Sequence, residues 1–338
     1  MTVPEAIAHV VARCDLNEGD AFDLMGRLMD GEGTPAQVGA LLTALRMKGE
    51  TIDELVGAAR AMRARMLEVR VERPVVDTCG TGGDGLHTFN VSTAAALIAA
   101  GAGAAVAKHG NRAISGRVGG ADALEALGVV VDLPPERVAR CIAEAGIGFC
   151  FAPRFHAAMR SLAVPRREIG IRTMLNLLGP LANPAGADAQ LVGVFAPEWT
   201  PLVAEALCRL GTRRALVVHG DDGLDEISAA TSTRVSEVAE GKVRTYHLEP
   251  GDFGIEPSGP APVAADAAAS AALVRGVLGG EPGPARELAL VNAAAVLVVA
   301  GKAESMREGY ERAVEAIANG AAAQALAHLV TSSRGTAA

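Results

Sequence analysis

The sequence predicts an α/β fold in which a small N-terminal helical domain precedes a larger domain with a central, mostly parallel sheet flanked by helices. Up to about Arg70 the apolar residues recur only at helical spacing, whereas from Pro74 onward short β-branched runs alternate with Ala-rich stretches. Half of the 338 residues are hydrophobic but only 3% are aromatic. Such a composition favours small-residue helices packed closely on a sheet.

Two helix starts in the N-terminal region carry explicit caps. Thr34 is followed by Pro35 and Gln37, and Thr51 stands three positions before Glu54. Each Thr and its partner fit the capping-box pattern, in which two side chains satisfy two otherwise unpaired N–H groups. A proline at the first helical position loses no hydrogen bond. We therefore expect a helix directly after each Thr, and a small helical bundle overall.

From residue 74 the rhythm predicts repeated strand and helix units, and hence a parallel or mixed sheet. An Arg-, Asn-, Pro- and Gly-rich segment, 163–187, interrupts it, and we interpret this segment as a crossing back to the helical bundle. The expected domains are 1–72 joined by 165–187, and 73–164 with 188–338. Strands are expected at 75–77, 104–107, 129–132, 147–151, 191–194 and 215–219, and helices at 92–102, 122–127, 135–145, from 197, at 264–278 and at 285–300.

Composition excludes several functional classes. A net charge of −8 argues against a nucleic-acid partner, which would need a basic surface. The five cysteines form no C-x-x-C pair, so neither a disulfide framework nor a zinc site is indicated. The longest apolar runs, 94–107 and 288–300, fall short of the ~18 residues that span a bilayer, and the N-terminus does not resemble a signal peptide. We expect a cytoplasmic protein with no membrane partner.

A glycine-rich loop follows the first predicted strand. It reads Gly80-Thr81-Gly82-Gly83-Asp84-Gly85, and Asn90-Val91-Ser92-Thr93 then opens an Ala-rich helix. Glycines let backbone N–H groups approach a phosphate, and a helix N-terminus favours an anion. The alternative is a tight turn with a helix cap at Asn90 or Ser92. The spacing fits neither the dinucleotide nor the Walker pattern.

A second polar loop, 108–116, follows the predicted strand 104–107. It contains Lys108, His109, Asn111, Arg112 and Ser115. At the carboxyl end of a strand these side chains would face the crevice in which open α/β sheets bind ligands. The alternative is a solvated basic loop, since Lys and Arg are usually exposed.

Together these loops resemble the anthranilate phosphoribosyltransferase family, whose signatures are GTGGDG, NVST and KHGNR in this order. The segment RTMLNLLGPLANP at 172–184, the acidic pair Asp225-Glu226 and PGDFG at 250–254 extend the resemblance to at least residue 310. It implies transfer of the phosphoribosyl group of phosphoribosyl pyrophosphate (PRPP) to anthranilate, in tryptophan biosynthesis. It also implies a requirement for Mg²⁺, with two ions, and a homodimer formed through the helical domain.

The resemblance also implies roles for individual residues. The metal ligands would be Ser92, Asp225 and Glu226, although the acidic pair lies beside Asp221 and Asp222 and could instead be an exposed turn. No residue is expected to act as an acid or base. Anthranilate would contact Gly80, His109, Asn111, His156 and Arg166, with Arg167 on the opposite face. PRPP would contact Gly80, Gly83, Asp84, Thr88, Asn90, Val91, Ser92, Thr93, Lys108, His109, Gly110, Asn111, Arg112, Ala113, Ile114, Ser115, Gly116 and Gly120.

The chain departs from the commonest family pattern at 116–120, where Gly120 replaces a frequent hydroxyl contact to phosphate. This departure concerns substrate affinity and not the type of reaction. Two other functions stay open for such a fold. A pyrimidine nucleoside phosphorylase has similar domains and ribose C1 chemistry but a different phosphate loop, and a non-enzymatic nucleic-acid-binding relative would need a basic face.

Overall fold

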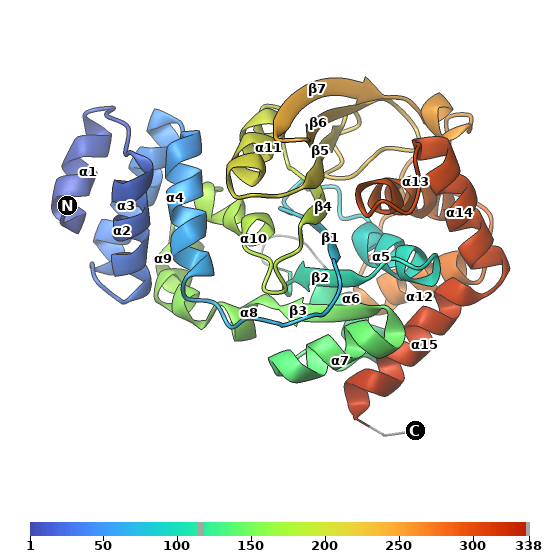
Figure 1. The fold of residues 1–338 in the computed structure, drawn as a ribbon. Helices are drawn as coiled ribbons and strands as arrows, with labels where there is room; N and C mark the ends of the chain where they lie inside the picture. The colour runs from blue at the N-terminus through green and yellow to red at the C-terminus, as the bar shows by residue number, and fades with distance from the viewer. Residues whose placement is uncertain (114–117, 336–338) are drawn as a thin grey trace.

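The structure is a computed structural model and describes residues 1–113 and 118–335. Its N-terminal part is a group of four helices that lies to one side of the sheet (Figure 1). The apolar faces of these helices pack on one another, with α2 against α4 and α1 against α3. The helices are α1 (Val3–Val11), α2 (Glu18–Met29), α3 (Pro35–Lys48) and α4 (Ile52–Arg63).

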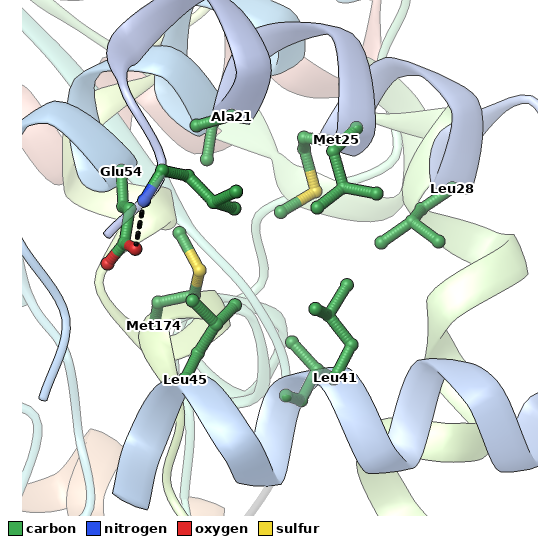
Figure 2. Close-up of a pocket in the computed structure, with 11 residues that line it drawn as sticks. Ala21, Met25, Leu28, Leu41, Leu45, Glu54 and Met174 are labelled. Carbon is green, nitrogen blue, oxygen red and sulfur yellow. Dashed lines mark hydrogen bonds between the residues drawn. The ribbon is translucent and has the colours of Figure 1, made fainter. Parts of the chain in front are cut away.

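Both predicted capping boxes are confirmed. The backbone N–H of Gln37 donates to Thr34 Oγ1 at 3.3 Å and that of Thr34 donates to Gln37 Oε1 at 2.9 Å, and Thr51 and Glu54 form the same pair. Glu54 is buried and also accepts the N–H of Leu16 at 3.0 Å, the bond drawn in Figure 2. The apolar cavity beside it has a volume of about 10 Å³. That volume is about one water molecule, so this cavity is too small for a substrate.

The central sheet has seven strands in the order β3-β2-β1-β4-β5-β6-β7. The first five in this order are parallel, and β6 and β7 form an antiparallel hairpin at one edge. The predicted fold class is therefore confirmed. The chain runs from β1 outward to β3 and then returns to the other side of β1, which puts a topological switch point between β1 and β4. The strands are β1 (Val76–Gly80), β2 (Val106–Gly110), β3 (Ile147–Phe151), β4 (Ala189–Gly193), β5 (Arg214–Gly220), β6 (Thr233–Ala239) and β7 (Lys242–Leu248).

Helices cover the sheet and build most of the core. On one side α5 and α13 pack on each other and on β1 and β4, and α14 packs on α13 and α15 on α5 (Figure 1). Alanines dominate this contact, which lets helix and strand backbones approach closely. These helices are α5 (Val91–Gly101), α6 (Gly120–Ala126), α7 (Pro135–Ala145), α11 (Trp199–Arg209), α12 (Ala267–Leu278), α13 (Pro284–Val299), α14 (Met306–Ala318) and α15 (Ala321–Arg334).

The segment between β3 and β4 is built from short helices. Most of its buried apolar residues, among them Leu162, Met174 and Leu178, belong to the same apolar cluster as the N-terminal helices, whereas Phe155 packs in the core of the α/β part. α9 packs on α3, and α10 packs on α4. The elements are α8 (Ala152–Phe155), the 3-10 turns η1 (Ala157–Leu162) and η2 (Met174–Asn176), α9 (Ala163–Ile169) and α10 (Leu178–Leu181).

One predicted strand is wrong: 129–132 is irregular chain. Val129 and Val131 are buried, which produced the strand-like pattern, but the segment is not part of the sheet, which ends at β3. The N–H of Val129 donates to Leu124 O at the end of α6, and that of Val130 donates to Ser333 Oγ at 3.0 Å.

The β6–β7 hairpin, α14 and α15 were not predicted. Among the described helices, none has the length and apolar character to cross a membrane.

Candidate active site

The glycine-rich loop and the acidic pair meet at the switch point, although they are far apart in the chain. The backbone N–H of Gly82 donates to Asp225 Oδ2 at 2.9 Å. Gly82 and Gly83 have φ values of +62° and +87°, which side-chain-bearing residues rarely adopt. A Cβ on Gly80 would lie 2.6 Å from Asp225 Oδ2. The loop is therefore shaped around the Asp225 carboxylate.

The start of α5 lies directly behind this loop. Asn90 caps the helix, because its Oδ1 accepts the N–H of Thr93 at 3.2 Å, so this part of the tight-turn interpretation is confirmed. The preceding Thr88 forms a bridge with Val263, and Val91 is buried. A capped helix N-terminus next to an open glycine loop still favours an anion, so the two interpretations are compatible here.

Lys108 is buried at 2% exposure and not solvated. Its Nζ donates to Thr78 O at 2.7 Å and to Ser92 Oγ at 2.9 Å. Burial lowers the pKa of Lys108, while the carboxylate of Asp77 opposes that shift. The Lys108 side chain is thus held between β1 and the start of α5 by two hydrogen bonds.

His109, the next residue, belongs to a buried histidine pair. Its Nδ1 lies 3.0 Å from Gly179 O, and its ring centroid is 5.0 Å from that of His156. Burial lowers the pKa of His109, and burial with a smaller contribution from His109 lowers the pKa of His156 to about 3. Both rings are therefore neutral at cellular pH, and any cation for a carboxylate substrate must come from elsewhere.

Of the two neighbouring arginines in α9, Arg166 is half-buried and Arg167 is exposed. Burial lowers the pKa of Arg166, and no acidic residue in the described ranges forms an ion pair with it. A partly desolvated guanidinium without an internal counter-charge is suited to bind a carboxylate of a ligand.

The rest of the second loop is only partly described. Ile114, Ser115 and Gly116 lie outside the described residues. Arg112 is exposed and forms a bidentate ion pair with Glu125, so for this residue the solvated-loop interpretation holds. The flanking Gly110, Asn111 and Ala113 are half-buried.

The departure at Gly120 is not forced by lack of space. Gly120 is the first residue of α6, and a Cβ there would lie 3.7 Å from Lys108 Cε and 4.0 Å from Asn90 Oδ1. These are ordinary contact distances. Gly120 is thus next to the buried ammonium, where a hydroxyl side chain would fit.

Asp225 and Glu226 are crowded and half-buried, not an exposed turn. Burial, together with the nearby Asp84 carboxylate, raises the pKa of Asp225 to about 7. Burial and the charge of Asp225 raise the pKa of Glu226 well above its usual value. Such a cluster of oxygen ligands is relieved by a cation, and with Ser92 Oγ it fits the hard-oxygen preference of Mg²⁺.

Among the described residues no group of three or more His, Cys, Asp or Glu side chains is arranged around a metal position. A metal at this edge of the sheet would therefore depend on the two carboxylates, the serine hydroxyl and oxygens of a substrate. That requirement suits Mg²⁺, which commonly keeps several non-protein ligands.

Sequence reasoning missed residues that shape the site from behind. A Cβ on Gly193, at the end of β4, would overlap Asp225 O, so this close approach requires glycine. Asp77 and Asn183 are buried and bonded to each other and to β2. Gly193 ends a strand beside Gly80, a signal that could have been noticed. The role of Asp77 and Asn183 depends on tertiary contacts and has no local signal.

Family models match both parts of the chain. The α/β domain of the Glycosyl transferase family matches residues 72–323, and the helical bundle domain of that family matches residues 4–66. Fold and site thus define the class: this is a glycosyltransferase with a helical bundle domain and an α/β domain.

More specific relatives share one name. The chain is 52% identical to the anthranilate phosphoribosyltransferase of Thioalkalivibrio sulfidiphilus over 98% of either chain. The crystal structure of the enzyme from Thermus thermophilus has a TM-score of 0.92 at 47% identity and covers 98% of this chain and 99% of that one. The chain belongs to the anthranilate phosphoribosyltransferase family, which confirms the resemblance inferred from the loops.

A more distant structure carries ligands. The Saccharomyces cerevisiae anthranilate phosphoribosyltransferase in complex with PRPP and Mg has a TM-score of 0.88 at 27% identity, over 98% of both chains. Another structure of the yeast enzyme holds 4-fluoroanthranilate.

Proposed function

We propose that this chain transfers the 5-phosphoribosyl group of PRPP to the amine of anthranilate, giving N-(5-phosphoribosyl)anthranilate and pyrophosphate, in tryptophan biosynthesis. The observation that carries the proposal is the convergence of the glycine loop, buried Lys108 and the Asp225-Glu226 pair at one switch point. Relatives with this name, about half identical over nearly the whole chain, support it.

The PRPP site would consist of the glycine loop, the start of α5 and the loop after β2. Gly80, Gly83 and Asp84 would meet the pyrophosphate side, and Lys108 would supply a fixed positive charge from below. The anthranilate site would lie towards Arg166, whose guanidinium fork matches a carboxylate. Its other contacts would be Gly80, His109, Asn111 and His156.

In the reaction, a C–N bond forms between the anthranilate amine and C1 of the ribose while the C1–O bond to pyrophosphate breaks. An aromatic amine is neutral at cellular pH and nucleophilic, so no strong base is needed. The leaving pyrophosphate takes the electron pair, and the amine proton passes to solvent. The chain must therefore orient two substrates and stabilise charge on the leaving group.

Two Mg²⁺ ions are proposed, one on Ser92 and one on Asp225 and Glu226. Bound there, they would neutralise pyrophosphate charge in the reactant and in the leaving group. The support is the crowding of the carboxylates, which a cation relieves, and the Mg bound with PRPP in the yeast relative.

A fluorescence assay tests the function. Anthranilate should be consumed only when both PRPP and Mg²⁺ are present. Thymidine and uridine with phosphate test the nucleoside phosphorylase alternative, and cleavage of either without anthranilate consumption would replace the proposal. A mobility-shift titration at low salt tests the nucleic-acid-binding alternative.

We also propose the domain division 1–72 with 165–187, and 73–164 with 188–338, supported by the packing of α9 and α10 on α3 and α4. A cytoplasmic location is consistent with five unpaired cysteines.

For the homodimer, the support is a hollow of about 360 Å³ between α1 and α3, beside the exposed Val11 and Met47. Light scattering should give twice the chain mass for wild type and a lower mass for Met47→Glu.

A further inference from the structure

The backbone pairing between β1 and β2 stops early. Val76 pairs with Val106, and no later residue of β1 pairs with β2. On their other sides β1 pairs with β4 as far as Gly80, and β2 pairs with β3 as far as Gly110. The break is therefore local, and it lies at the carboxyl ends of the two strands, under the proposed substrate site.

Side chains replace the missing backbone bonds. Asp77 Oδ1 accepts the N–H of His109 at 3.0 Å, and Thr78 O accepts the ammonium of Lys108 at 2.7 Å. Asp77 Oδ2 accepts one N–H of the Asn183 side chain at 2.8 Å. The same Asn183 nitrogen donates to Ala107 O at 2.8 Å. A carboxylate and an amide thus join β1 to β2 in place of a regular ladder.

The pair is buried and well bonded, as a positioning element must be. Asp77 is 0% exposed and Asn183 is 4% exposed. Asn183 Oδ1 accepts the N–H of Ala185 at 2.8 Å, so the amide is fixed in one orientation. Asn183 also lies where the crossing segment returns to the sheet, just before β4 begins at Ala189.

The stretch of β2 that this pair holds carries both substrate sites. Lys108 and His109 are consecutive, so they point to opposite faces of the sheet. Lys108 reaches Ser92, on the side of the PRPP loop, and His109 reaches Gly179 and His156, on the side proposed for anthranilate. A shift of this strand end would move both groups together.

We infer that Asp77 and Asn183 act as a positioning pair that sets where Lys108 and His109 lie, and thereby couples the PRPP and anthranilate sites. The inference rests on the proposed function for the identity of the two substrates. Neither residue is placed in contact with a substrate. A purely structural pair would affect stability alone, whereas a positioning pair affects both substrates in the protein that remains folded.

The test is a residue swap. In Asp77→Asn a side-chain N–H₂ must face either the N–H of His109 or the amide of Asn183, so one buried donor loses its acceptor. We expect kcat/KM for each substrate, and PRPP affinity by calorimetry, to fall roughly ten- to hundredfold. In Asp77→Asn with Asn183→Asp the bond between the two side chains is remade with donor and acceptor exchanged, while Ala107 O loses its donor as it also does in Asn183→Asp alone. We therefore expect at least a tenfold recovery over Asn183→Asp. Asn183→Asp alone places the carboxylates of residues 77 and 183 opposite each other, so its kcat/KM and PRPP affinity should be the lowest of the three variants.

Gln190→Met is the matched control. Gln190 is buried, lies opposite Asp77 on β4 and donates to Pro180 O at 2.9 Å, but it contacts no residue of β2 through this bond. It should lose stability while PRPP affinity stays within about twofold of wild type. A Gln190→Met variant as impaired as Asp77→Asn would reduce the pair to ordinary core packing and overturn the inference.

Hydrogen exchange of the His109 amide gives a readout that needs no substrate. Exchange over 106–110 should be faster in Asp77→Asn and in Asn183→Asp than in wild type, and slower in the swap than in Asn183→Asp. If wild type consumes no anthranilate, the proposed function fails, and the pair is then judged by exchange and PRPP affinity alone. If Asp77→Asn does not fold, the comparison of the swap with Asn183→Asp tests the inference instead. A swap no better folded, protected or active than Asn183→Asp overturns the inference.

Discussion

Gly80→Ala perturbs the point at which the glycine loop meets the acidic pair. The new methyl group would lie 2.6 Å from Asp225 Oδ2, whereas ordinary contact starts at about 3.4 Å, so the carboxylate must move by about 0.8 Å. The clash is with the end of a side chain and not with backbone, so the fold should survive. The displaced carboxylate loses the 2.9 Å bond from the Gly82 N–H. A charge-assisted bond contributes ~1.5–3 kcal/mol, which corresponds to roughly ten- to hundredfold.

The assay is kcat/KM for PRPP as a function of Mg²⁺ concentration, with the melting temperature measured in parallel. We expect a loss of roughly ten- to hundredfold at limiting Mg²⁺ and partial recovery at saturating Mg²⁺. Gly251→Ala is the control, because a Cβ there meets nothing within 4 Å. If Gly80→Ala keeps the Mg²⁺ dependence and kcat/KM of wild type, the carboxylate of Asp225 does not hold the metal.

Three further predictions follow from the site. Asp225→Asn with Glu226→Gln should lose most activity but remain folded, since two crowded carboxylates are removed; full turnover at limiting Mg²⁺ would disprove the metal assignment. Arg166→Ala should raise KM for anthranilate roughly ten- to hundredfold and leave PRPP affinity unchanged, while Arg167→Ala behaves as wild type; the reverse pattern would mean that the segment is out of register. Burial lowers the pKa of His156 to about 3, so below about pH 6.5 the unfolded chain takes up a proton that the folded chain does not. Stability should therefore fall as pH drops from 6.5 towards 3, and urea titrations should find a smaller fall for His156→Asn.

The parts of the fold that could be predicted are those that depend on residues close together in the sequence. The capping boxes at Thr34 and Thr51 depend on residues three positions apart, so they could be recognised from the sequence alone. The segment 129–132 has the alternation of a strand, but the N–H groups of Val129 and Val130 donate to Leu124 O and Ser333 Oγ and not to a neighbouring strand. A strand pattern indicates burial on one face, and only the tertiary structure decides whether a partner exists.

In the site, too, local signals could be recognised from the sequence, whereas tertiary contacts could not. Glycine loops and polar clusters after strands predicted which segments meet at one edge of the sheet, because parallel strands bring their carboxyl ends together. Burial could not be predicted: Lys108, expected in a loop that faces the ligand crevice, lies in β2, is 2% exposed and is held by Thr78 and Ser92. Asp77 and Asn183 are 106 residues apart, and their bond is visible only once the crossing segment is folded against β1.

The stoichiometry of the reaction is the sharpest test of the proposed transfer. Isotopically labelled anthranilate, PRPP and Mg²⁺ are incubated with the protein, and labelled product and released pyrophosphate are both quantified. We predict one pyrophosphate for each anthranilate consumed, with the label attached to a phosphoribosyl group. Pyrophosphate release that is independent of anthranilate, or anthranilate left unchanged in the presence of both PRPP and Mg²⁺, would contradict the proposed function.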